Sequence, residues 1–362
     1  MFLAWRDLRF AKGRFALMGT VITLITLLVG LLSGLTAGLG RQNTSAITGL
    51  PADMLAFQAP SGGQDLSFSR STVTWRQWRQ WSGAPGVQSA EPLGIAVTMA
   101  TAGDKSIGVS AFGVEPGSRL APHGDAIGDR AVVLSTEAAE DLDVRAGDSF
   151  TLAGRPATVA AVGGDAAYSH TPVIWTGLDI WQRIAPPTGS GEDRRATVIA
   201  LRLASTTDTA AVDRRAGTRT VSTGDALSAI GSYASENGSL QLMRGFLFAI
   251  SALVIGAFFT VWTMQRSGDV AVLKALGAST AGLLADALGQ AVLLLTGGTL
   301  LGTGIAAAVG ALLSGGTAPF LLTPATVLVP AAVMILLGAL GAALSIRRIT
   351  SIDPLTALGS AR

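Results

Sequence analysis

Residues 15–40 read FALMGTVITLITLLVGLLSGLTAGLG and contain no Asp, Glu, Lys or Arg. A helix needs roughly 20 apolar residues to cross the hydrocarbon core of a bilayer, so this run is long enough for one span. Residues 245–265 and 287–346 lack the same four residue types, and the longer stretch is interrupted near Ser314-Gly315-Gly316. We therefore predict four transmembrane helices, over about 15–40, 243–265, 282–312 and 325–346.

The segment between the first two spans, residues 41–240, has the composition of a soluble domain. The whole chain is 49% hydrophobic and only 14% charged, and most of its charge lies in this segment. Strand-like runs occur at 107–114, 131–134 and 158–162, and Ser135 has the position of an N-cap for a helix over 135–142. The expected fold is therefore an α-helical membrane protein with four transmembrane helices and a mixed α/β extracytoplasmic domain.

The distribution of basic residues predicts the orientation in the membrane. Segments 1–14, 266–280 and 347–362 together carry nine basic and three acidic residues, whereas residues 41–238 carry 16 basic and 20 acidic ones. Short cytoplasmic flanks are enriched in Lys and Arg. We expect both termini and the 266–280 loop to lie in the cytoplasm and the large domain to lie outside, in a multi-pass protein of the plasma membrane.

The ends of the chain have distinct patterns. Within residues 1–14, aromatic and aliphatic side chains alternate with Arg6, Arg9 and Lys12. This pattern predicts an interfacial helix on the cytoplasmic leaflet, although a simple charged flank that sets topology would also fit. Residues 347–362 form a basic cytoplasmic tail.

Three segments resemble a known family. Residues 131–162 (AVVLSTEAAEDLDVRAGDSFTLAGRPATVAAV) look like the periplasmic core domain of MacB-like permeases. Residues 265–279 (QRSGDVAVLKALGAS) and 347–358 (RRITSIDPLTAL) resemble the FtsX-like permease signature and its closing motif. The resemblance implies a MacB-like core over 41–240, an FtsX-like permease domain over 241–346, a homodimer, and two copies of a cytoplasmic ABC ATPase that uses ATP and Mg.

The residues themselves exclude several other functions. The three lysines, Lys12, Lys105 and Lys274, do not follow glycine, so the chain contains no phosphate-binding loop and ATP hydrolysis must come from a separate chain. Cysteine is absent and the two histidines, His123 and His170, lie in dissimilar loops, which argues against a built-in metal centre or bound cofactor. The net charge of +2 gives no indication of nucleic-acid binding.

The loop over 266–280 is predicted to dock on the ATPase. An amphipathic helix just inside the membrane suits a groove on a partner protein, although it could also lie in the lipid interface. The family resemblance favours docking. The residues expected to carry the coupling are Arg266, Asp269, Val270, Leu273, Lys274, Leu276 and Gly277.

Small residues recur at helical spacing in the first two spans. Gly30, Gly34 and Gly38 form a ladder in the first span, and Ala252 and Gly256 have the same spacing in the second. Such ladders allow helix backbones to approach closely. They predict either close packing within one subunit or a homodimer interface, which the family resemblance places near these spans.

The beginning of the second span is the expected substrate region. Tyr233, Glu236 and Met243 share one helical face with Leu240, and Arg244 follows. Tyr, carboxylate and thioether groups can ligate haem iron, and an arginine can pair with a propionate. The family includes compact haem exporters, so we expect haem as the first candidate substrate, with Glu236 and Met243 as preferred ligands, Tyr233 next, and Tyr168 and His170 more remote. The alternative is an interfacial belt in contact with membrane lipids.

Three classes of function fit these features. The first is an exporter of an amphiphile, either haem or a lipid, peptide or lipoprotein. The second is an FtsX-like mechanotransmitter that regulates cell-envelope hydrolysis without transport. The third is a membrane-anchored sensor, which the three-span C-terminal half argues against, because anchoring needs one span only.

Overall fold

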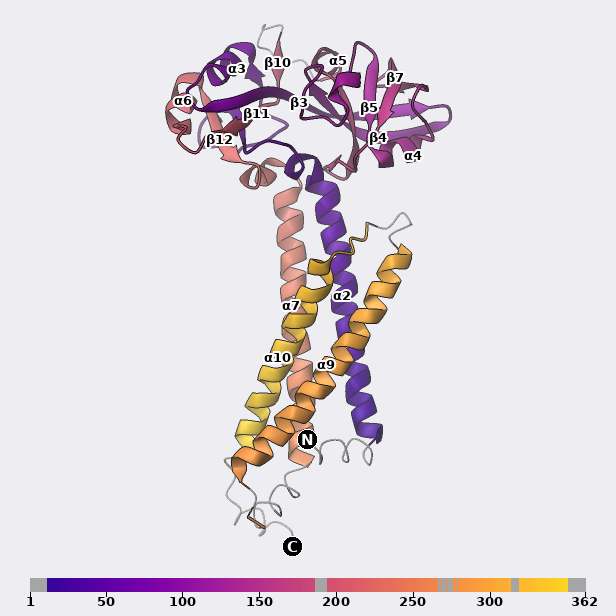
Figure 1. Ribbon diagram of the computed structural model, residues 1–362, viewed down its shortest axis with the longest axis vertical. Helices are drawn as coiled ribbons and strands as arrows, with labels where there is room; N and C mark the ends of the chain where they lie inside the picture. The colour runs from indigo at the N-terminus through magenta and orange to yellow at the C-terminus, as the bar shows by residue number, and fades with distance from the viewer. Residues whose placement is uncertain are drawn as a thin grey trace. The chain divides into compact units, whose positions relative to one another are not determined.

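The computed structural model describes residues 12–185, 194–265, 268, 272, 276–277, 279–313 and 319–350. The chain divides into two compact units, which are considered separately (Figure 1). The helical unit comprises the chain up to Gly38 and from Ser239 onward, and the α/β unit comprises Leu39–Gly238. Residues 1–11, which include most of the expected interfacial helix, and the tail from 351 lie outside the described residues.

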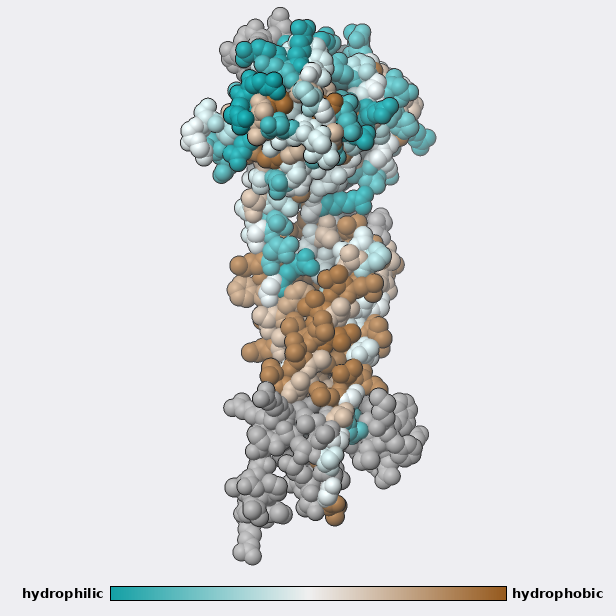
Figure 2. Space-filling view, turned by 60° about the vertical axis from the view of Figure 1, so that its left-hand side comes forward, coloured by the Kyte–Doolittle hydropathy of each residue, from teal (hydrophilic) through white to brown (hydrophobic). Residues whose placement is uncertain are grey.

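Four long helices account for the predicted spans. They are α2 (Lys12–Thr48), α7 (Tyr233–Gln265), α9 (Thr280–Leu313) and α10 (Pro324–Thr350). Each contains a stretch apolar and long enough to cross a membrane, and Figure 2 shows hydrophobic side chains gathered over the helices. The four spans are confirmed, but α2 continues to Thr48 rather than ending near residue 40, and α7 begins at Tyr233 rather than near 243. Polar side chains in these extensions are satisfied by the α/β unit, so the helices need not end at the last apolar residue.

Small residues bring the helices of the helical unit close together. A Cβ atom added at Gly298 of α9 would lie 2.8 Å from Ile22 Cγ2, and one at Gly302 would lie 2.5 Å from the carbonyl oxygen of Thr23. A Cβ atom at Gly338 of α10 would lie 2.4 Å from Leu295. Because these contacts need glycine, they fix how α9 approaches α2 and α10. The core between the helices is formed by Phe15, Met18, Ile22, Val29, Ile255, Phe259, Trp262, Ala291, Leu295, Met334 and Ala342.

The α/β unit is built from twelve strands among its described residues. The strands are β1 (Met54–Gln58), β2 (Val73–Thr74), β3 (Val87–Ala102), β4 (Lys105–Val114), β5 (Ala131–Leu134), β6 (Ser149–Leu152), β7 (Arg155–Val162), β8 (Ala167–Tyr168), β9 (Thr171–Gly177), β10 (Arg195–Ala196), β11 (Val198–Leu203) and β12 (Thr218–Ser222). The helices are α3 (Trp75–Ser82), α4 (Thr136–Leu142), α5 (Leu178–Ile184) and α6 (Thr209–Ala216), with short 3-10 turns at Gly124–Ala126 and Asp225–Ala229.

Strand β3 joins two lobes of this unit. In the first lobe, the strands pair in the order β12-β1-β11-β3, with β3 at the edge of an antiparallel sheet. In the second lobe, the pairing continues from β3 through β4, β9, β5, β7 and β6. Since β6 also pairs with β3, through Ala100–Leu152 and Thr101–Thr151, this second lobe closes on itself. Its interior is packed with aliphatic side chains such as Val109, Val132 and Ile174.

Local sequence signals account for the elements that were predicted. The side chain of Ser135 accepts a hydrogen bond from the backbone N–H of Ala138, so α4 has the expected N-cap. Strands β4, β5 and β7 overlap the three expected runs, and a turn at Ala153-Gly154 joins β6 to β7.

Candidate functional site

A tight turn at the end of the β8–β9 hairpin is hydrogen-bonded to the last two turns of α2. Ser169 and His170 both have positive φ angles, 49° and 62°, as in the turns that suit two-residue hairpin loops. The backbone N–H of Ser169 donates to the carbonyl oxygen of Asn43 at 3.1 Å, and that of His170 donates to Gln42 at 3.2 Å. Because α2 continues to Thr48, these bonds are additional to those within the helix, and they join the hairpin turn to the last two turns of α2.

The side chain of His170 meets Glu236 on the first turn of α7. His170 Nε2 lies 2.7 Å from Glu236 Oε2, and the amide of Asn43 donates to the same oxygen at 2.8 Å. The Asn43 amide also lies 3.4 Å from the hydroxyl of Ser232. We call Asn43, His170, Ser232 and Glu236 the junction cluster; it joins the end of α2, the hairpin turn and the start of α7 within the α/β unit.

Further contacts hold the end of α2 in place. Arg41 forms an exposed ion pair with Asp165 at 3.3 Å. The hydroxyl of Ser45 accepts a hydrogen bond from the backbone N–H of Ala167 at 2.9 Å. The polar end of α2 is therefore bound to β8 and the segment before it, and these bonds explain why the helix extends past residue 40.

The two tyrosines named from the sequence are both packed into the α/β unit. Tyr168 is 6% exposed, and its ring makes edge contacts with Phe68 and Phe112. Burial raises the pKa of the Tyr168 phenol above its ordinary value, so the neutral form is favoured there. Tyr233 packs against the same core. Neither tyrosine joins the junction cluster.

The remaining substrate candidates lie further along α7, in the helical unit. Met243 is 49% exposed and belongs to a stripe of exposed apolar residues on this helix. Arg244 is partly buried, and its Nε atom has no hydrogen-bond partner among the residues that the structure describes. The stripe consists of Leu242, Met243, Phe246, Ile250 and Leu253.

The glycine ladder of α2 faces its own chain. A Cβ atom added at Gly30 would lie 2.9 Å from the Cβ of Ala306, and one at Gly34 would lie 2.2 Å from the ring of Phe320. At Gly38 the added atom would lie 2.0 Å from the carbonyl oxygen of Pro319. The backbone N–H of Leu321 also donates to the carbonyl of Gly34 at 3.1 Å. These glycines admit the segment before α10 against α2.

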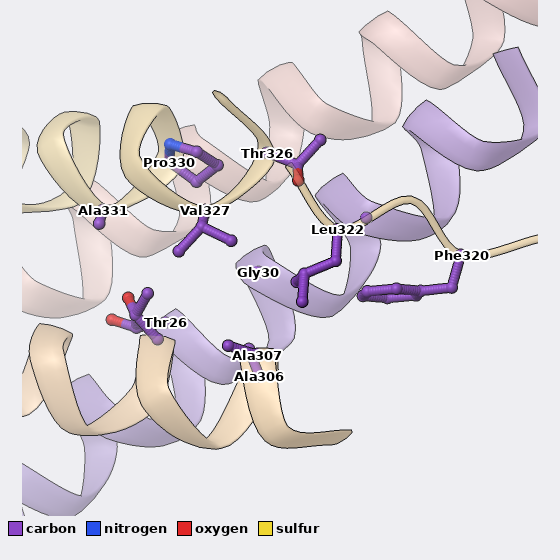
Figure 3. A pocket seen from close by; sticks show the side chains of 12 residues that line it. Thr26, Gly30, Ala306, Ala307, Phe320, Leu322, Thr326, Val327, Pro330 and Ala331 are labelled. Carbon is purple, nitrogen blue, oxygen red and sulfur yellow. The ribbon is translucent and has the colours of Figure 1, made fainter. Parts of the chain in front are cut away.

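A small hollow lies beside this ladder (Figure 3). Its labelled side chains come from α2 (Thr26), from α9 (Ala306 and Ala307), and from α10 with the segment before it, which contributes Phe320 and Pro330. No charged residue lines it among the described residues, and the hydroxyl of the buried Thr26 has no hydrogen-bond partner. The polar groups of its described lining are the hydroxyls of Thr26, Thr303 and Thr326.

The small residues of the second span are placed differently. A Cβ atom at Gly256 would have nothing within 4 Å, and a Cβ atom added at Gly341 of α10 would make only an ordinary contact with the Cα of Gly256, at 3.4 Å. Ala252 is partly buried on the same helix.

The predicted coupling residues lie mostly outside the described residues, namely Arg266, Asp269, Val270, Leu273 and Lys274. Leu276 is described and is 79% exposed, one helical turn after Val272, which is 58% exposed. The backbone N–H of Leu276 donates to the carbonyl of Val272 at 3.0 Å, and Gly277 has a φ of 93°. This part of the loop thus presents two apolar side chains.

The sequence analysis named Glu236 but missed Asn43 and Ser232. The side-chain amide of Asn43 donates hydrogen bonds to both Ser232 and Glu236. The available signal was the polar run Arg41-Gln42-Asn43-Thr44-Ser45, which directly follows the apolar run at 15–40. The structure also brings His170, a remote candidate, into direct contact with Glu236. Within the described residues, no group of three or more His, Asp or Glu side chains could hold a metal ion.

Two family models together match most of the chain. The MacB-like periplasmic core domain matches residues 15–219, and the FtsX-like permease C-terminal domain matches residues 242–354. A protein of Staphylococcus haemolyticus named as a hemin transport system permease, HrtB, is 24% identical over 364 residues, which cover 99% of each chain. An uncharacterized ABC transporter permease of Mycobacterium bovis is 26% identical over 373 residues, again 99% of each chain.

Solved structures resemble part of the chain. The extracellular domain of the ABC-type transporter YknZ from Gram-positive bacteria matches 47% of this chain and 98% of its own, with 14% identity and a TM-score of 0.35. The periplasmic region of MacB from Actinobacillus actinomycetemcomitans matches 51% and 95%, with 14% identity and a TM-score of 0.33. With the two family models and the four spans, the chain belongs to the MacB/FtsX-like permeases and is an ABC transporter permease of the plasma membrane.

Proposed function

We propose that this permease exports an amphiphile, with haem the leading substrate, and that a separate ABC ATPase drives it. The observation that carries the proposal is the end-to-end similarity, at about 25% identity, to proteins named as hemin permeases. An amphiphile that partitions into the bilayer needs no aqueous pore. The absence of charge in the hollow beside α2, among the described residues, agrees with such a substrate.

Glu236 and Met243 are the proposed iron ligands. Both belong to α7, Glu236 in the α/β unit and Met243 in the helical unit, and they are seven residues apart in the sequence. The side chain of Glu236 is 41% exposed and Met243 is 49% exposed, so both can be reached. Carboxylate and thioether groups can both act as axial ligands. Glu236 would then exchange its bond to His170 for the metal.

Arg244 is the proposed partner of a haem propionate. Its Nε atom is buried without a hydrogen-bond partner, which is costly for a charged group. A carboxylate of the substrate would satisfy that donor through a charge-assisted hydrogen bond. Arg244, which directly follows Met243, would therefore bind the propionate while Glu236 and Met243 bind the iron.

The functional assembly is proposed to be a homodimer. The stripe of Leu242, Met243, Phe246, Ile250 and Leu253 on α7 is exposed, whereas the opposite face holds the buried Ile255 and Phe259. A second protomer that packed along this stripe would place two copies of Met243 near the same seam. The substrate would then be held between protomers and released when ATP closes the dimer.

The partner ATPase is proposed to dock on the 266–280 loop. Val272 and Leu276 are exposed apolar residues one turn apart, which suits a groove in a partner. Replacing Leu276 with aspartate should abolish permease-dependent stimulation of the ATPase, because a charge in an apolar interface costs several kcal/mol. The Leu276→Met variant is the matched control and should retain stimulation. Full stimulation in Leu276→Asp would exclude this loop as the docking element.

Haem titration tests the substrate directly. Haemin added to the purified permease in detergent should produce a saturable shift of the Soret band. Glu236→Ala and Met243→Leu should each change the shape of that band and weaken binding. Met264→Leu, another methionine exposed on α7 at 63%, should leave both unchanged. Absence of a saturable change would remove haem and favour a lipid or peptide substrate or mechanotransmission.

A further inference from the structure

The hydroxyl group of Thr26 on α2 is buried in the helical unit without a partner. The residue is 2% exposed, and its Oγ1 atom has no hydrogen-bond partner among the residues that the structure describes. A threonine inside a helix can donate to the carbonyl four residues earlier, as Thr260 of α7 does to Gly256 at 2.8 Å. Thr26 does not use that bond. Because buried polar groups are nearly always paired, its partner is to be sought in the hollow that Thr26 lines (Figure 3).

Helix α10 brings a second polar group to the same hollow. Pro330 lies inside this helix, is buried, and lines the hollow together with Thr326. Proline has no backbone N–H, so the carbonyl of Thr326, four residues earlier, lacks the donor that an ordinary helix supplies. The hydroxyl of Thr326 is engaged elsewhere, because it donates to the carbonyl of Leu321 at 3.1 Å. Backbone groups without a partner are especially costly inside a bilayer.

The size of the hollow limits what can pair with these groups. The space open to the centre of a water-sized sphere is about 10 Å³. On this measure one water molecule needs about 10–15 Å³ and two to four polar partners. The hydroxyl of Thr303 on α9 also lines the hollow, so three polar groups are available with the Thr26 hydroxyl and the Thr326 carbonyl. The hollow thus fits a single water and is too small for an acyl chain.

We propose that one water molecule occupies this hollow, accepts a hydrogen bond from the hydroxyl of Thr26 and donates to the carbonyl of Thr326 and the hydroxyl of Thr303. The water joins α2, α9 and α10 within the span. It satisfies the carbonyl that Pro330 leaves without a donor, as ordered waters do for prolines of other transmembrane helices. The site does not depend on the identity of the exported substrate.

The sign of the stability change in Thr26→Val tests the proposal. Valine has nearly the shape of threonine but no hydroxyl. If the water is bound, this variant removes one of its partners, and the thermal unfolding midpoint of the full-length permease in lipid nanodiscs should fall by about 2–4 °C. If the hydroxyl is simply unpaired, valine removes a desolvated polar group, and the midpoint should stay at or above the parental value. That second result would overturn the proposal.

A second substitution shows whether the bond reaches α10. In Pro330→Ala the new backbone N–H can donate to the carbonyl of Thr326, so the water loses that partner. The loss caused by Thr26→Val should then shrink to less than about half of its size in the parental background, since coupled residues are not additive. An equal loss in both backgrounds would overturn the proposed bridge.

Thr299→Val is the matched control for Thr26→Val. Thr299 is 0% exposed and its hydroxyl also lacks a partner among the described residues, but it does not line the hollow. Its effect on the midpoint should be the same with and without Pro330→Ala. A coupling to Pro330 as large as that of Thr26 would show that the double variants report a general change of the helices, and the water bridge would be rejected.

A density map of the permease in nanodiscs, at a resolution that shows other internal waters, gives the direct observation. One peak is expected about 2.5–3.0 Å from Thr26 Oγ1, the range of O–H···O hydrogen bonds. Such a map with no peak in the hollow, or with an acyl chain in its place, would contradict the proposal.

Discussion

Helices α2 and α7 have similar lengths and hydropathy but differ in how their glycines pack in the helical unit. The glycines of α2 admit Ala306, Pro319 and Phe320 of the same chain at distances that no larger residue would allow. The first turns of α7 in this unit instead leave Phe246, Ile250 and Leu253 between 56% and 73% exposed. Apolar side chains such as Leu24 and Leu28 are also exposed on α2, so the difference is that glycines pack α2 tightly against its own chain, whereas Gly245 and Gly256 of α7 show no such close approach.

The contrast shows what a ladder of small residues can indicate. Gly30, Gly34 and Gly38 permit close approach of any backbone, whether from the same chain or from a second copy. In the structure that approach comes from the segment 319–321 and from α9. The exposed stripe on α7, made of large residues, is the face proposed above to meet a partner protomer or a substrate.

The largest effect is expected at Gly38. In Gly38→Ala the new methyl group would meet the backbone carbonyl of Pro319, which cannot move aside as a side chain can. We expect a loss of about 3 kcal/mol in the free energy of unfolding, at the upper end of overpacking costs. The thermal unfolding midpoint in detergent measures it.

Gly19→Ala is the matched control for Gly38→Ala on the same helix. A Cβ atom at Gly19 would have nothing within 4 Å, so this variant should unfold at the parental temperature or slightly above it. Equal midpoints for the two variants would mean that α2 is not packed against the segment before α10.

A smaller effect is expected where the end of α2 meets the start of α7. Asn43→Asp replaces a donor to Glu236 with a second carboxylate at the same 2.8 Å separation. We expect a loss of about 1–3 kcal/mol at neutral pH, the cost of an unpaired buried group. The loss should shrink as the pH falls, because protonation of either carboxyl group restores a donor. Unfolding midpoints across pH measure both.

Thr48→Asp controls for the added charge at the end of α2. Thr48 is exposed and makes no hydrogen bond to Glu236 among the described residues, so a carboxylate at this position stays solvated. A loss as large as that of Asn43→Asp would show that negative charge alone at this helix end, and not the junction cluster, accounts for the effect.

The smallest effect is expected in α7 at Gly256. Gly256→Ala adds a methyl group that meets nothing within 4 Å and improves helix propensity. The unfolding midpoint should stay within the range of about 0.5 kcal/mol that is typical of surface substitutions. A large loss would show that the second span is packed as tightly as α2, and the division between the two helices would fail.

Local signals explain the parts of the fold that the sequence predicts. Ser135 caps α4 because capping depends on residues three apart, and each transmembrane run carries its own apolar signal. Strand β3 was missed because it serves two lobes, so its burial follows no single alternation. The extension of α2 to Thr48 is supported by hydrogen bonds to β8. Helix propensities describe residues near each other in sequence, so they could not predict these bonds.

The site was predicted only in part for the same reason. Glu236 and Met243 were found because they share one helix face. The contact of His170 with Glu236 joins residues 66 positions apart and depends on the fold of the hairpin between them. The sequence could not decide whether the glycine ladder packs within one subunit or against a second protomer, because glycine permits close approach of either.

The central claim is that α7, and not α2, presents the face that meets the substrate. The natural chain has no cysteine, so single cysteines at Phe246 of α7 and Leu28 of α2 can be labelled cleanly; these positions are 61% and 55% exposed. Labelling rates with N-ethylmaleimide should be measured in detergent with and without haemin. Haemin should slow labelling at position 246 at least about fivefold and leave position 28 unchanged. Equal protection at both positions, or protection at position 28 alone, would contradict the account.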